Sequence, residues 1–309
     1  MLRLNLIFAI VFLMGSCSDD ENNKTPPPQV PLNPPNATGV VYLQSNLNLA
    51  KAYSNFTTAL KNNENISIVE ELDHSKNAAS VELELPPTQI VFFGNPNLGT
   101  PLMQENQLAG LDLPQKVLFY EDENEVFSMY NSTQYFASRY GVHEVESLPQ
   151  ISDALKNLVG TAVDAQGKQT SDQDVDLEEG IVSVESTTDF ETTYNNLKSS
   201  IEANENLNVV AELDHKQNAA SVEMELRPTR IIMFGNPNLG TPLMQSERSL
   251  GLDLPQKMLV WEDAEGSVQI SYNDPGFLKQ KHQLDGNNEE IEKISTALEM
   301  LANSAAEIE

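Results

Sequence analysis

The chain is poor in the residues on which several common functions depend. It has one cysteine, Cys17, in 309 residues, so it cannot form an internal disulfide. It has 18 lysines and arginines against 46 aspartates and glutamates, a formal net charge of −28. An electrostatic field of that sign repels phosphate backbones, and no basic stripe interrupts it. We therefore expect no nucleic-acid partner.

The one long apolar run lies at the N-terminus. Met1–Ser16 carries a single base, Arg3, before the apolar residues Leu6–Met14. Such a run is typical of the central region of a signal peptide and is too short to span a bilayer as a helix. Because small residues precede Cys17, the segment resembles a bacterial lipoprotein signal, in which the cysteine is acylated. We predict a lipoprotein signal peptide over residues 1–17 with lipidation of Cys17; the alternative is a plain secretory signal.

Residues 18–38 read as an acidic, proline-rich tether. Ser18–Glu21 is acidic, and six prolines follow within Thr25–Pro35, a composition that favours extended, semi-rigid spacers. The acidic stretch resembles the surface-export signal of some bacterial lipoproteins. We therefore expect a lipid-anchored protein of the bacterial cell envelope, at the outer membrane or exposed on the surface, with the leaflet left open.

The rest of the chain contains one sequence twice. Glu71–Lys116 aligns with Glu212–Lys257 at a constant offset of 141 residues, and 34 of the 46 positions are identical. A period of that size matches one domain, so the sequence predicts a first repeat over residues 39–163, an acidic linker over 164–180 and a second repeat over 181–309. The constraint on the common block is either folding, through glycine and proline in turns, or a site made by the block.

Hydrophobic periodicity predicts the same elements in each repeat. Apolar residues at helical spacing mark a first helix from Leu49 to Leu60, with its counterpart from Phe190 to Ile201, and a last helix in each copy around Leu155 and Leu298. Asp274 followed by Pro275 is typical of a helix start. Consecutive strands lie between these helices, at Gly39–Ser45, Ile66–Leu72, residues 81–85, Ile90–Phe93 and a hairpin of Val117–Tyr120 with Val126–Tyr130. Consecutive strands indicate a mostly antiparallel sheet and an α+β class.

The common block resembles a known family. Asp-His-x-x-Asn-Ala at Asp73–Ala78 and Asp214–Ala219, Phe-Gly-Asn-Pro-x-x-Gly-Thr-Pro-Leu-Met, and Leu-Asp-Leu-Pro are similar to the domain of unknown function 302 family. The resemblance implies a fold like one repeat of the TATA-binding protein, β-α-β4-α. It also implies an internal pseudo-dimer of the two repeats, since single-copy relatives look like dimers. It assigns no activity, and the fold carries no function with it.

A glycine loop is the first candidate site. Gly94, Gly99 and Thr100 have the spacing of a phosphate-binding loop, but no lysine follows Gly99. Thr100 and Pro101 read instead as the cap and first residue of a short helix, whose backbone N–H groups could bind a carboxylate or phosphate. The alternative is a rigid strand-to-helix turn. The ligand-binding candidates are Gly94, Asn95, Gly99, Thr100, Gly235, Asn236, Gly240, Thr241, Asn77 and Asn218.

The Asp-His pairs are the second candidate. Histidine titrates near neutrality and ligates metals, so Asp73-His74 and Asp214-His215 are the catalytic candidates. Neighbouring residues on a strand point to opposite faces, so the aspartate is not expected to orient its histidine. Two histidines meeting across a pseudo-dimer axis would suit a metal, whereas the alternative is a structural histidine at a strand end. One histidine per copy is too few for a dedicated zinc site.

Isolated acids complete the candidates. Asp112 and Asp253, each within Leu-Asp-Leu-Pro, read as buried turn acceptors, since a catalytic carboxylate needs a partner. Asp172, Asp174 and Asp176 have the spacing of a calcium loop, but Leu177 replaces the required glycine and Ser183 the bidentate glutamate. We expect a solvated linker there.

These observations favour a non-catalytic module that binds a small ligand or a protein partner. The competing class is a hydrolytic or metal-dependent enzyme using His74 or His215, although no Gly-x-Ser-x-Gly elbow is present. The third class is a purely structural assembly module. The sequence identifies no cofactor or metal.

Overall fold

A computed structural model describes residues 34–308. Pro35–Glu309 forms one compact unit that contains both repeats. The predicted signal peptide over residues 1–17, the lipidation of Cys17 and most of the tether over residues 18–38 lie outside the described residues.

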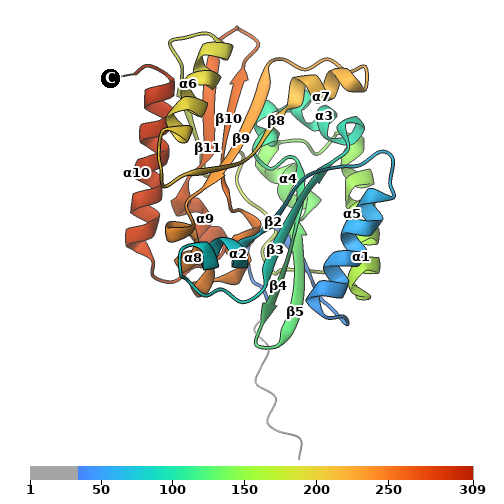
Figure 1. The fold of residues 1–309 in the computed structure, drawn as a ribbon. Helices are drawn as coiled ribbons and strands as arrows, with labels where there is room; N and C mark the ends of the chain where they lie inside the picture. Colours follow the sequence, from blue (N-terminus) through green and yellow to red (C-terminus); the bar gives the residue numbers. More distant parts are fainter. Residues whose placement is uncertain (1–33, 309) are drawn as a thin grey trace, which may run out of the picture. The chain divides into compact units, whose positions relative to one another are not determined.

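Both repeats follow the predicted β-α-β4-α order, with further short helices between the strands (Figure 1). The elements of repeat one are β1 (Val40–Gln44), α1 (Leu49–Lys61), β2 (Ser67–Asp73), α2 (His74–Ser80), β3 (Thr88–Gly94), α3 (Pro96–Glu105), η1 (Gln107–Leu111), β4 (Gln115–Asp122), β5 (Glu125–Asn131), α4 (Thr133–Tyr140), α5 (Ser147–Val163) and β6 (Lys168–Gln169).

Repeat two has a counterpart for each of these elements except β6. Its elements are β7 (Ile181–Glu185), α6 (Phe190–Glu202), β8 (Asn208–Asp214), α7 (His215–Ser221), β9 (Thr229–Gly235), α8 (Pro237–Ser246), η2 (Arg248–Leu252), β10 (Gln256–Glu262), β11 (Val268–Asn273), α9 (Pro275–Lys281) and α10 (Asn288–Ala305). The predicted α+β class and mostly antiparallel sheets are confirmed, because every strand pair in both sheets is antiparallel.

Each repeat builds its own sheet. The strand order is β2-β3-β4-β5-β1-β6 in the first sheet and β7-β11-β10-β9-β8 in the second. Alternate residues of β3 and β4 therefore face opposite sides, and both sides are apolar: Val91, Phe93 and Phe119 pack with one core cluster, whereas Ile90 and Phe92 pack with another. A sheet with two apolar faces needs other secondary-structure elements packed on both of them.

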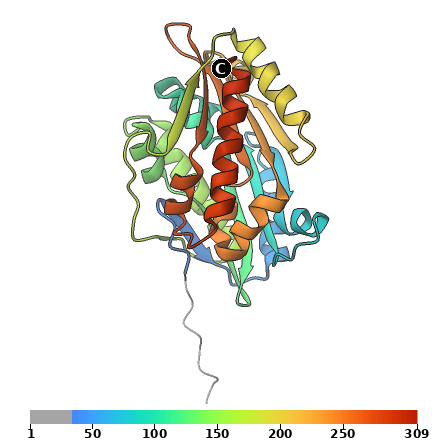
Figure 2. The same ribbon diagram turned by 90° about the vertical axis from the view of Figure 1, so that its left-hand side faces the viewer.

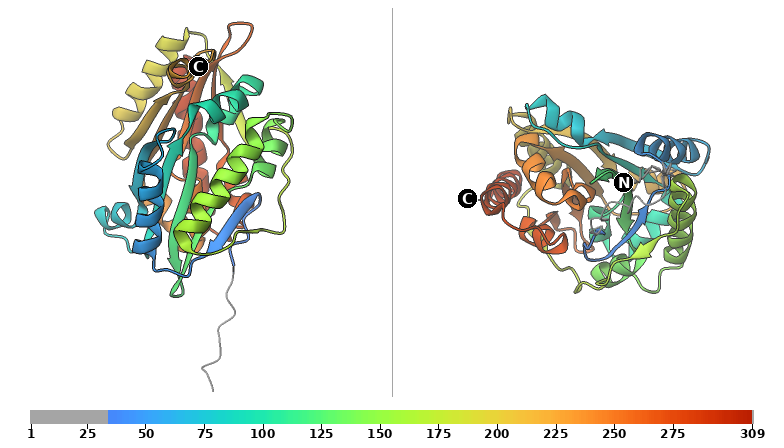
Figure 3. Two further views of the ribbon diagram at one scale, coloured as in Figure 1. Left: turned by 90° about the vertical axis from the view of Figure 1, so that its right-hand side faces the viewer. Right: turned by 90° about the horizontal axis from the view of Figure 1, so that it is seen from below.

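The long helices supply the outer layer. Helix α1 starts where the Asn48 side chain accepts a hydrogen bond from the Lys51 N–H, and its apolar face carries Phe56 and Leu60. Helices α1 and α5 lie together on the outer side of the first sheet (Figure 3), and α10 lies on the opposite outer side of the molecule, over the second sheet (Figure 2). The inner faces of the two sheets are therefore left for contacts between the repeats.

The inner face of each sheet receives the 3-10 helix of the other repeat. Leu111 of η1 packs against Ile231 and Leu259 of the second sheet. A side chain at Gly110 would meet Leu259 at 3.0 Å, and one at Gly251 of η2 would meet Leu118 at 3.2 Å. Glycine is present at both positions because the backbone approaches the opposite sheet this closely. The contact is reciprocal: η1 packs on the second sheet and η2 packs on the first.

The strand predicted over residues 81–85 is absent, and that prediction was wrong. Val81 ends α2 as its C-cap, Glu82 takes a left-handed backbone angle of φ 61°, and the Leu83 N–H donates to the Ala78 carbonyl. The second copy repeats the turn, with φ 59° at Glu223. The alternating apolar and acidic residues therefore belong to the end of a helix, which closes with a left-handed residue in a Schellman motif.

The acidic segment over residues 164–180 is partly structured. Lys168 and Gln169 form β6, which pairs with β1 through Tyr42 and Val41. The Thr170 hydroxyl donates to the carbonyl of Ala37 at 2.8 Å. The segment expected to be a solvated linker therefore extends the first sheet at its edge.

Candidate functional sites at the repeat interface

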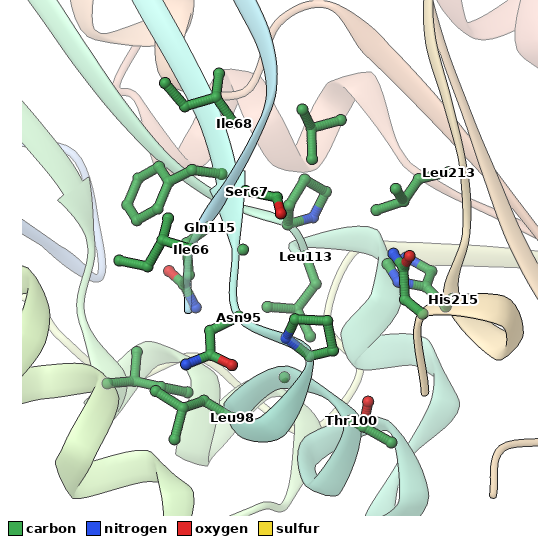
Figure 4. Close-up of a pocket in the computed structure, with 18 of the residues that line it drawn as sticks. Ile66, Ser67, Ile68, Asn95, Leu98, Thr100, Leu113, Gln115, Leu213 and His215 are labelled. Carbon is green, nitrogen blue, oxygen red and sulfur yellow. The ribbon is translucent and has the colours of Figure 1, made fainter. Parts of the chain in front are cut away.

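Two cavities lie between the repeats, and their linings correspond at every position but one: Glu212 lines cavity one, whereas Glu70, not its counterpart Glu71, lines cavity two. Cavity one, of about 420 Å³, is lined by the glycine loop of repeat one and by His215 and Asn218 of repeat two. Cavity two, of about 350 Å³, is lined by the glycine loop of repeat two and by His74 and Asn77 of repeat one. Figure 4 shows Asn95 and Gln115 across cavity one from Leu213 and His215. Each cavity thus needs both repeats.

All the predicted ligand-binding residues line these cavities. The loop residues of cavity one are Gly94, Asn95, Gly99 and Thr100, and those of cavity two are Gly235, Asn236, Gly240 and Thr241. The histidine and glycine-loop candidates of one copy do not share a cavity. They combine with those of the other copy, so the two histidines lie in different cavities.

The glycine loop itself differs from the prediction. Asn95 is the N-cap of α3 and Pro96 its first residue, so Thr100 and Pro101 lie inside the helix and the predicted cap at Thr100 was wrong. The Asn95 side chain accepts from the Asn97 N–H, and the Asn95 carbonyl accepts from the N–H of Leu98 and Gly99. Pro96 has no N–H. The helix start therefore offers an anion few of the donors that such a site requires.

His74 is a buried contact between the repeats. Its Nε2 lies 3.1 Å from the carbonyl oxygen of Gly251 in η2. A carbonyl can only accept, so Nε2 carries the proton and donates it. Burial lowers the pKa of His74 to about 4, and the Gly251 carbonyl and Asp73 offset this only in part. His74 is therefore neutral at pH 7, with Nε2 committed to η2.

His215 has the corresponding position but lacks the bond. Burial lowers the pKa of His215 to about 4 as well, and its side chain is 3% exposed. The Gly110 carbonyl lies on its Nε2 side and favours the protonated form, but within residues 34–308 no group meets Nε2 in hydrogen-bond geometry. Cavity one thus contains a buried polar atom without a partner, which costs free energy until something satisfies it.

The aspartates of the Asp-His pairs serve the helices that follow them. Asp73 accepts the N–H of Lys76 as N-cap of α2, and its other oxygen accepts from Gln89. Asp214 accepts the N–H of Gln217 and pairs with Arg230 at 2.9 Å. Neither carboxylate is hydrogen-bonded to its neighbouring histidine, as expected from the sequence. No group of three or more metal-ligating side chains occurs among the described residues.

Apolar side chains make most of the remaining cavity wall. In cavity one these include Ile66, Phe93, Leu155 and Leu158, from three different elements. Two lining residues also have a buried polar atom without a hydrogen-bond partner within residues 34–308: Gln115 of cavity one at Nε2 and Thr241 of cavity two at Oγ1. An apolar cavity with a few fixed polar groups is the usual form of a small-molecule site.

A buried charge cluster lies beside the cavities, and sequence analysis missed most of it. Lys116 donates to Asp112 at 2.8 Å and to Asp253 of the other repeat at 2.7 Å. Asp253 also accepts from Lys281 and His282, each at 2.8 Å. Arg139 lies 3.1 Å from Asp112 and donates to Asn273. These residues, with Lys257, Tyr135, Tyr140 and Asn131, form what we call the ion cluster.

Asp112 and Asp253 were expected to be buried turn acceptors, and their partners explain their burial. Burial alone would raise the pKa of Asp112, but positive charges led by Lys116 outweigh it and hold that pKa well below its usual value. The same balance, again led by Lys116, lowers the pKa of Asp253. Both carboxylates are therefore ionised, and each is fully satisfied by donors.

The sequence did contain a signal for this cluster. Lys116 and Lys257 precede the apolar strand residues Val117–Tyr120 and their counterparts, and both lysines occur four positions after the aspartate. A lysine at the same place in two copies of an otherwise apolar strand indicates a buried base with a paired acid. The cross-repeat pairing could not be read from one copy alone.

The remaining acidic candidates lie apart. Asp172 accepts from Thr38, whereas Asp174 accepts from Gln134 and Ser138, so these two carboxylates point to different partners. Asp176 is exposed. Glu121 and Asp122 lie at the end of β4, half-exposed beside the hairpin turn. None of them lines either cavity.

Comparison with known proteins gives two family matches along the chain. The family described as "Domain of unknown function DUF302" matches over residues 41–161 and again over 182–301. A solved structure described as an uncharacterized conserved DUF302 protein from Bacillus stearothermophilus is 18% identical, with a TM-score of 0.38, and the similarity covers 41% of this chain and 98% of that one.

Curated proteins also show similarity over part of the chain. The fluoride-specific ion channel FluC 1 of Brucella suis biovar 1 (strain 1330) is 40% identical over 108 residues, which are 35% of this chain and 42% of the channel protein. FluC 1 of Brucella abortus biovar 1 (strain 9-941) is 40% identical over 108 residues, 40% of its length. The chain thus spans less than half of these relatives. Between residues 34 and 308, no helix is long and apolar enough to cross a membrane.

Proposed function

This chain belongs to the DUF302 family, with two family domains in tandem, and we propose that it is a non-catalytic binding protein whose two inter-repeat cavities each hold a small molecule. The observation that carries the proposal is the reciprocal lining: both cavities combine the glycine loop of one repeat with the histidine and asparagine of the other. Volumes of about 420 and 350 Å³ are in the usual range for small-ligand sites.

The state of the histidines supports binding rather than catalysis. A general base needs a pKa near the working pH and a free nitrogen facing the substrate. His74 and His215 have pKa values lowered to about 4 by burial, and Nε2 of His74 is engaged by Gly251. The neighbouring aspartates are occupied as helix caps. The enzyme alternative would require His74 and the aspartates to leave their present partners, or His215 to act as a base with a pKa of about 4.

We further propose that the protein acts at the bacterial envelope through a lipid on Cys17. The support is the sequence pattern alone: one base, an apolar run, small residues and a unique cysteine. Metabolic labelling with a palmitate analogue tests the anchor, because Cys17→Ser should abolish the label and release the protein from the membrane fraction. Unchanged labelling of Cys17→Ser would contradict it.

Blocking the cavities one at a time tests the binding proposal. Ala154 on α5 and Ala297 on α10 are half-exposed wall residues at corresponding positions of cavities one and two. Ala154→Phe and Ala297→Phe should each fill one cavity with little effect on the core. Met300→Phe is the control, because Met300 lies on α10 with Ala297, is 67% exposed and lines neither cavity.

The measurement is native mass spectrometry of the compact segment Pro35–Glu309 after incubation with a small-molecule extract of the host cell. We expect up to two retained molecules in the parent and in Met300→Phe, one in each single variant and none in the double variant. Equal retention in all five proteins would place binding outside the cavities and contradict the proposal.

A further inference from the structure

The charged side chains that line the two cavities are all acidic. Cavity one has Glu212 and cavity two has Glu70, and neither lining includes a lysine or arginine. The Glu212 carboxylate is already engaged by Tyr194 at 2.7 Å and Lys198 at 2.7 Å, on α6. An anionic ligand would therefore enter without a counter-ion, past a protein of net charge −28.

A cationic ligand finds little better. Glu212 is committed to its own partners, and Glu70 lies beside the like charge of Glu71; burial followed by that charge raises the pKa of Glu70. His74 and His215 are neutral at pH 7 and offer no charge of either sign. Neither cavity provides the paired, fully hydrogen-bonded charge that a buried ion requires.

The polar side chains that line the cavities are uncharged apart from one glutamate in each. Asn95, Gln115 and Asn218 line cavity one, and their counterparts Asn236, Gln256 and Asn77 line cavity two. Amide side chains both donate and accept hydrogen bonds, so they suit a neutral polar group of a ligand.

We propose, on the premise of the binding function above, that both cavities select uncharged, largely apolar molecules carrying a neutral hydrogen-bonding group. The apolar walls supply the affinity, because binding removes apolar surface of the ligand and of the cavity from water. The amide side chains of the lining orient the ligand. A charged analogue of the same skeleton is rejected because its charge would be buried unpaired.

A neutral fluorescent probe and three matched competitors test the selection. N-phenylnaphthylamine is uncharged and brightens in apolar surroundings, so it reports occupancy of the cavities in the segment Pro35–Glu309 at pH 7. Naphthalenemethanol, naphthylmethylammonium and naphthylacetate share one ring system and are neutral, cationic and anionic. We expect the alcohol to displace the probe at a concentration at least about tenfold lower than either ion.

The cavity variants make each outcome informative. The probe should bind Met300→Phe like the parent, lose about half its sites in Ala154→Phe or Ala297→Phe, and lose nearly all in the double variant. If either ion displaces the probe as well as the alcohol does, and the variants still remove the sites, binding stands and the neutral selection is overturned. If the variants leave probe binding unchanged, the binding function itself fails.

Discussion

Lys116 and Lys257 occupy corresponding positions in the two repeats and lie in one cluster, yet their pKa values are shifted in opposite directions. Lys116 reaches Asp112 and Asp253 at 2.8 and 2.7 Å, whereas Lys257 comes only within 3.8 Å of Asp112. Burial opposes the charge on Lys116, but the two carboxylates raise its pKa. Burial and then the charge of Lys116 lower the pKa of Lys257 well below its usual value.

The difference shows that duplicated residues need not keep duplicated roles. Four buried bases, Lys116, Lys257, Lys281 and Arg139, share two buried carboxylates. Lys116 lies between the two carboxylates, and its positive charge disfavours a second charge on Lys257. Outside the common block the copies diverge further: Arg139 and Tyr140 of α4 correspond to Lys281 of α9 and to His282, its C-cap.

The largest expected effect comes from removing the acid that both repeats share. Asp253→Ala leaves Lys116 and Lys281 without a carboxylate that each now contacts directly. We expect a loss of about 3–5 kcal/mol in the free energy of unfolding, since the remaining charges stay buried and unpaired. Urea denaturation measures it, with Asp285→Ala, at an exposed residue between α9 and α10, as control. A loss no larger than the control's would mean that the ion cluster contributes little.

Acid should weaken the interface through the two histidines. Their folded-state pKa of about 4 lies below the unfolded value, so the unfolded chain binds more protons between these values. Stability is therefore full above about pH 6.5 and falls as the pH drops towards 4, by on the order of 3 kcal/mol per histidine.

Melting temperatures of the parent and of His74→Gln and His215→Gln between pH 7 and pH 4 check this sign. Each substitution should flatten the fall, and His143→Gln, at an exposed histidine, should leave it unchanged. A parent protein that is equally stable at pH 7 and pH 4.5 would refute the neutral assignment of the buried imidazoles.

The lysine comparison itself can be broken by two matched variants. We expect Lys257→Met to stay within about 1 kcal/mol of the parent, because methionine fills a similar volume and Lys257 comes only within 3.8 Å of a carboxylate. Lys116→Met should cost about 2–3 kcal/mol, since Asp112 and Asp253 lose their shared partner. Equal losses for the two variants would show that both lysines carry charge.

The smallest effect concerns the histidines at neutral pH. His74→Leu removes a hydrogen bond to the Gly251 carbonyl and should cost about 1 kcal/mol. His215→Leu removes no such bond and should be close to neutral or stabilising, because Nε2 of His215 has no partner within the described chain. The reverse order of stability would mean that His215 bonds Gly110 in solution.

Much of the fold could be predicted from the sequence, because periodicity and repetition report local structure. The helix from Leu49, the hairpin around Glu121–Glu125 and the cap at Asp274 all depend on neighbouring residues. The errors arose where two local patterns compete. Alternation at residues 81–85 is also what a helix end with a left-handed Glu82 produces, and Asn95 rather than Thr100 caps α3.

The site was less accessible, because its parts lie far apart in sequence. The glycine loop, His74 and Asn77 could be chosen from residue type, but their partners are in the other copy, as the pairing of Gly251 with His74 illustrates. A repeat compared only with itself gives no sign of which elements cross over. The ion cluster adds Arg139 and Lys281, which lie outside the common block and had no pattern to mark them.

The bond between Lys116 and Asp253 has a consequence for how such a gene can change. A single copy would keep Asp112 with Lys116, or Asp253 with Lys281, but would lose the buried bond between Lys116 and Asp253 that joins the copies. A substitution of Lys116 or Asp253 in one copy therefore changes the buried charge balance of the other. The two copies cannot vary independently at these positions. Substitutions far from the interface between the repeats are tolerated independently in each copy. A substitution at Lys116 or Asp253 is tolerated only when the partner residue in the other copy can accommodate it.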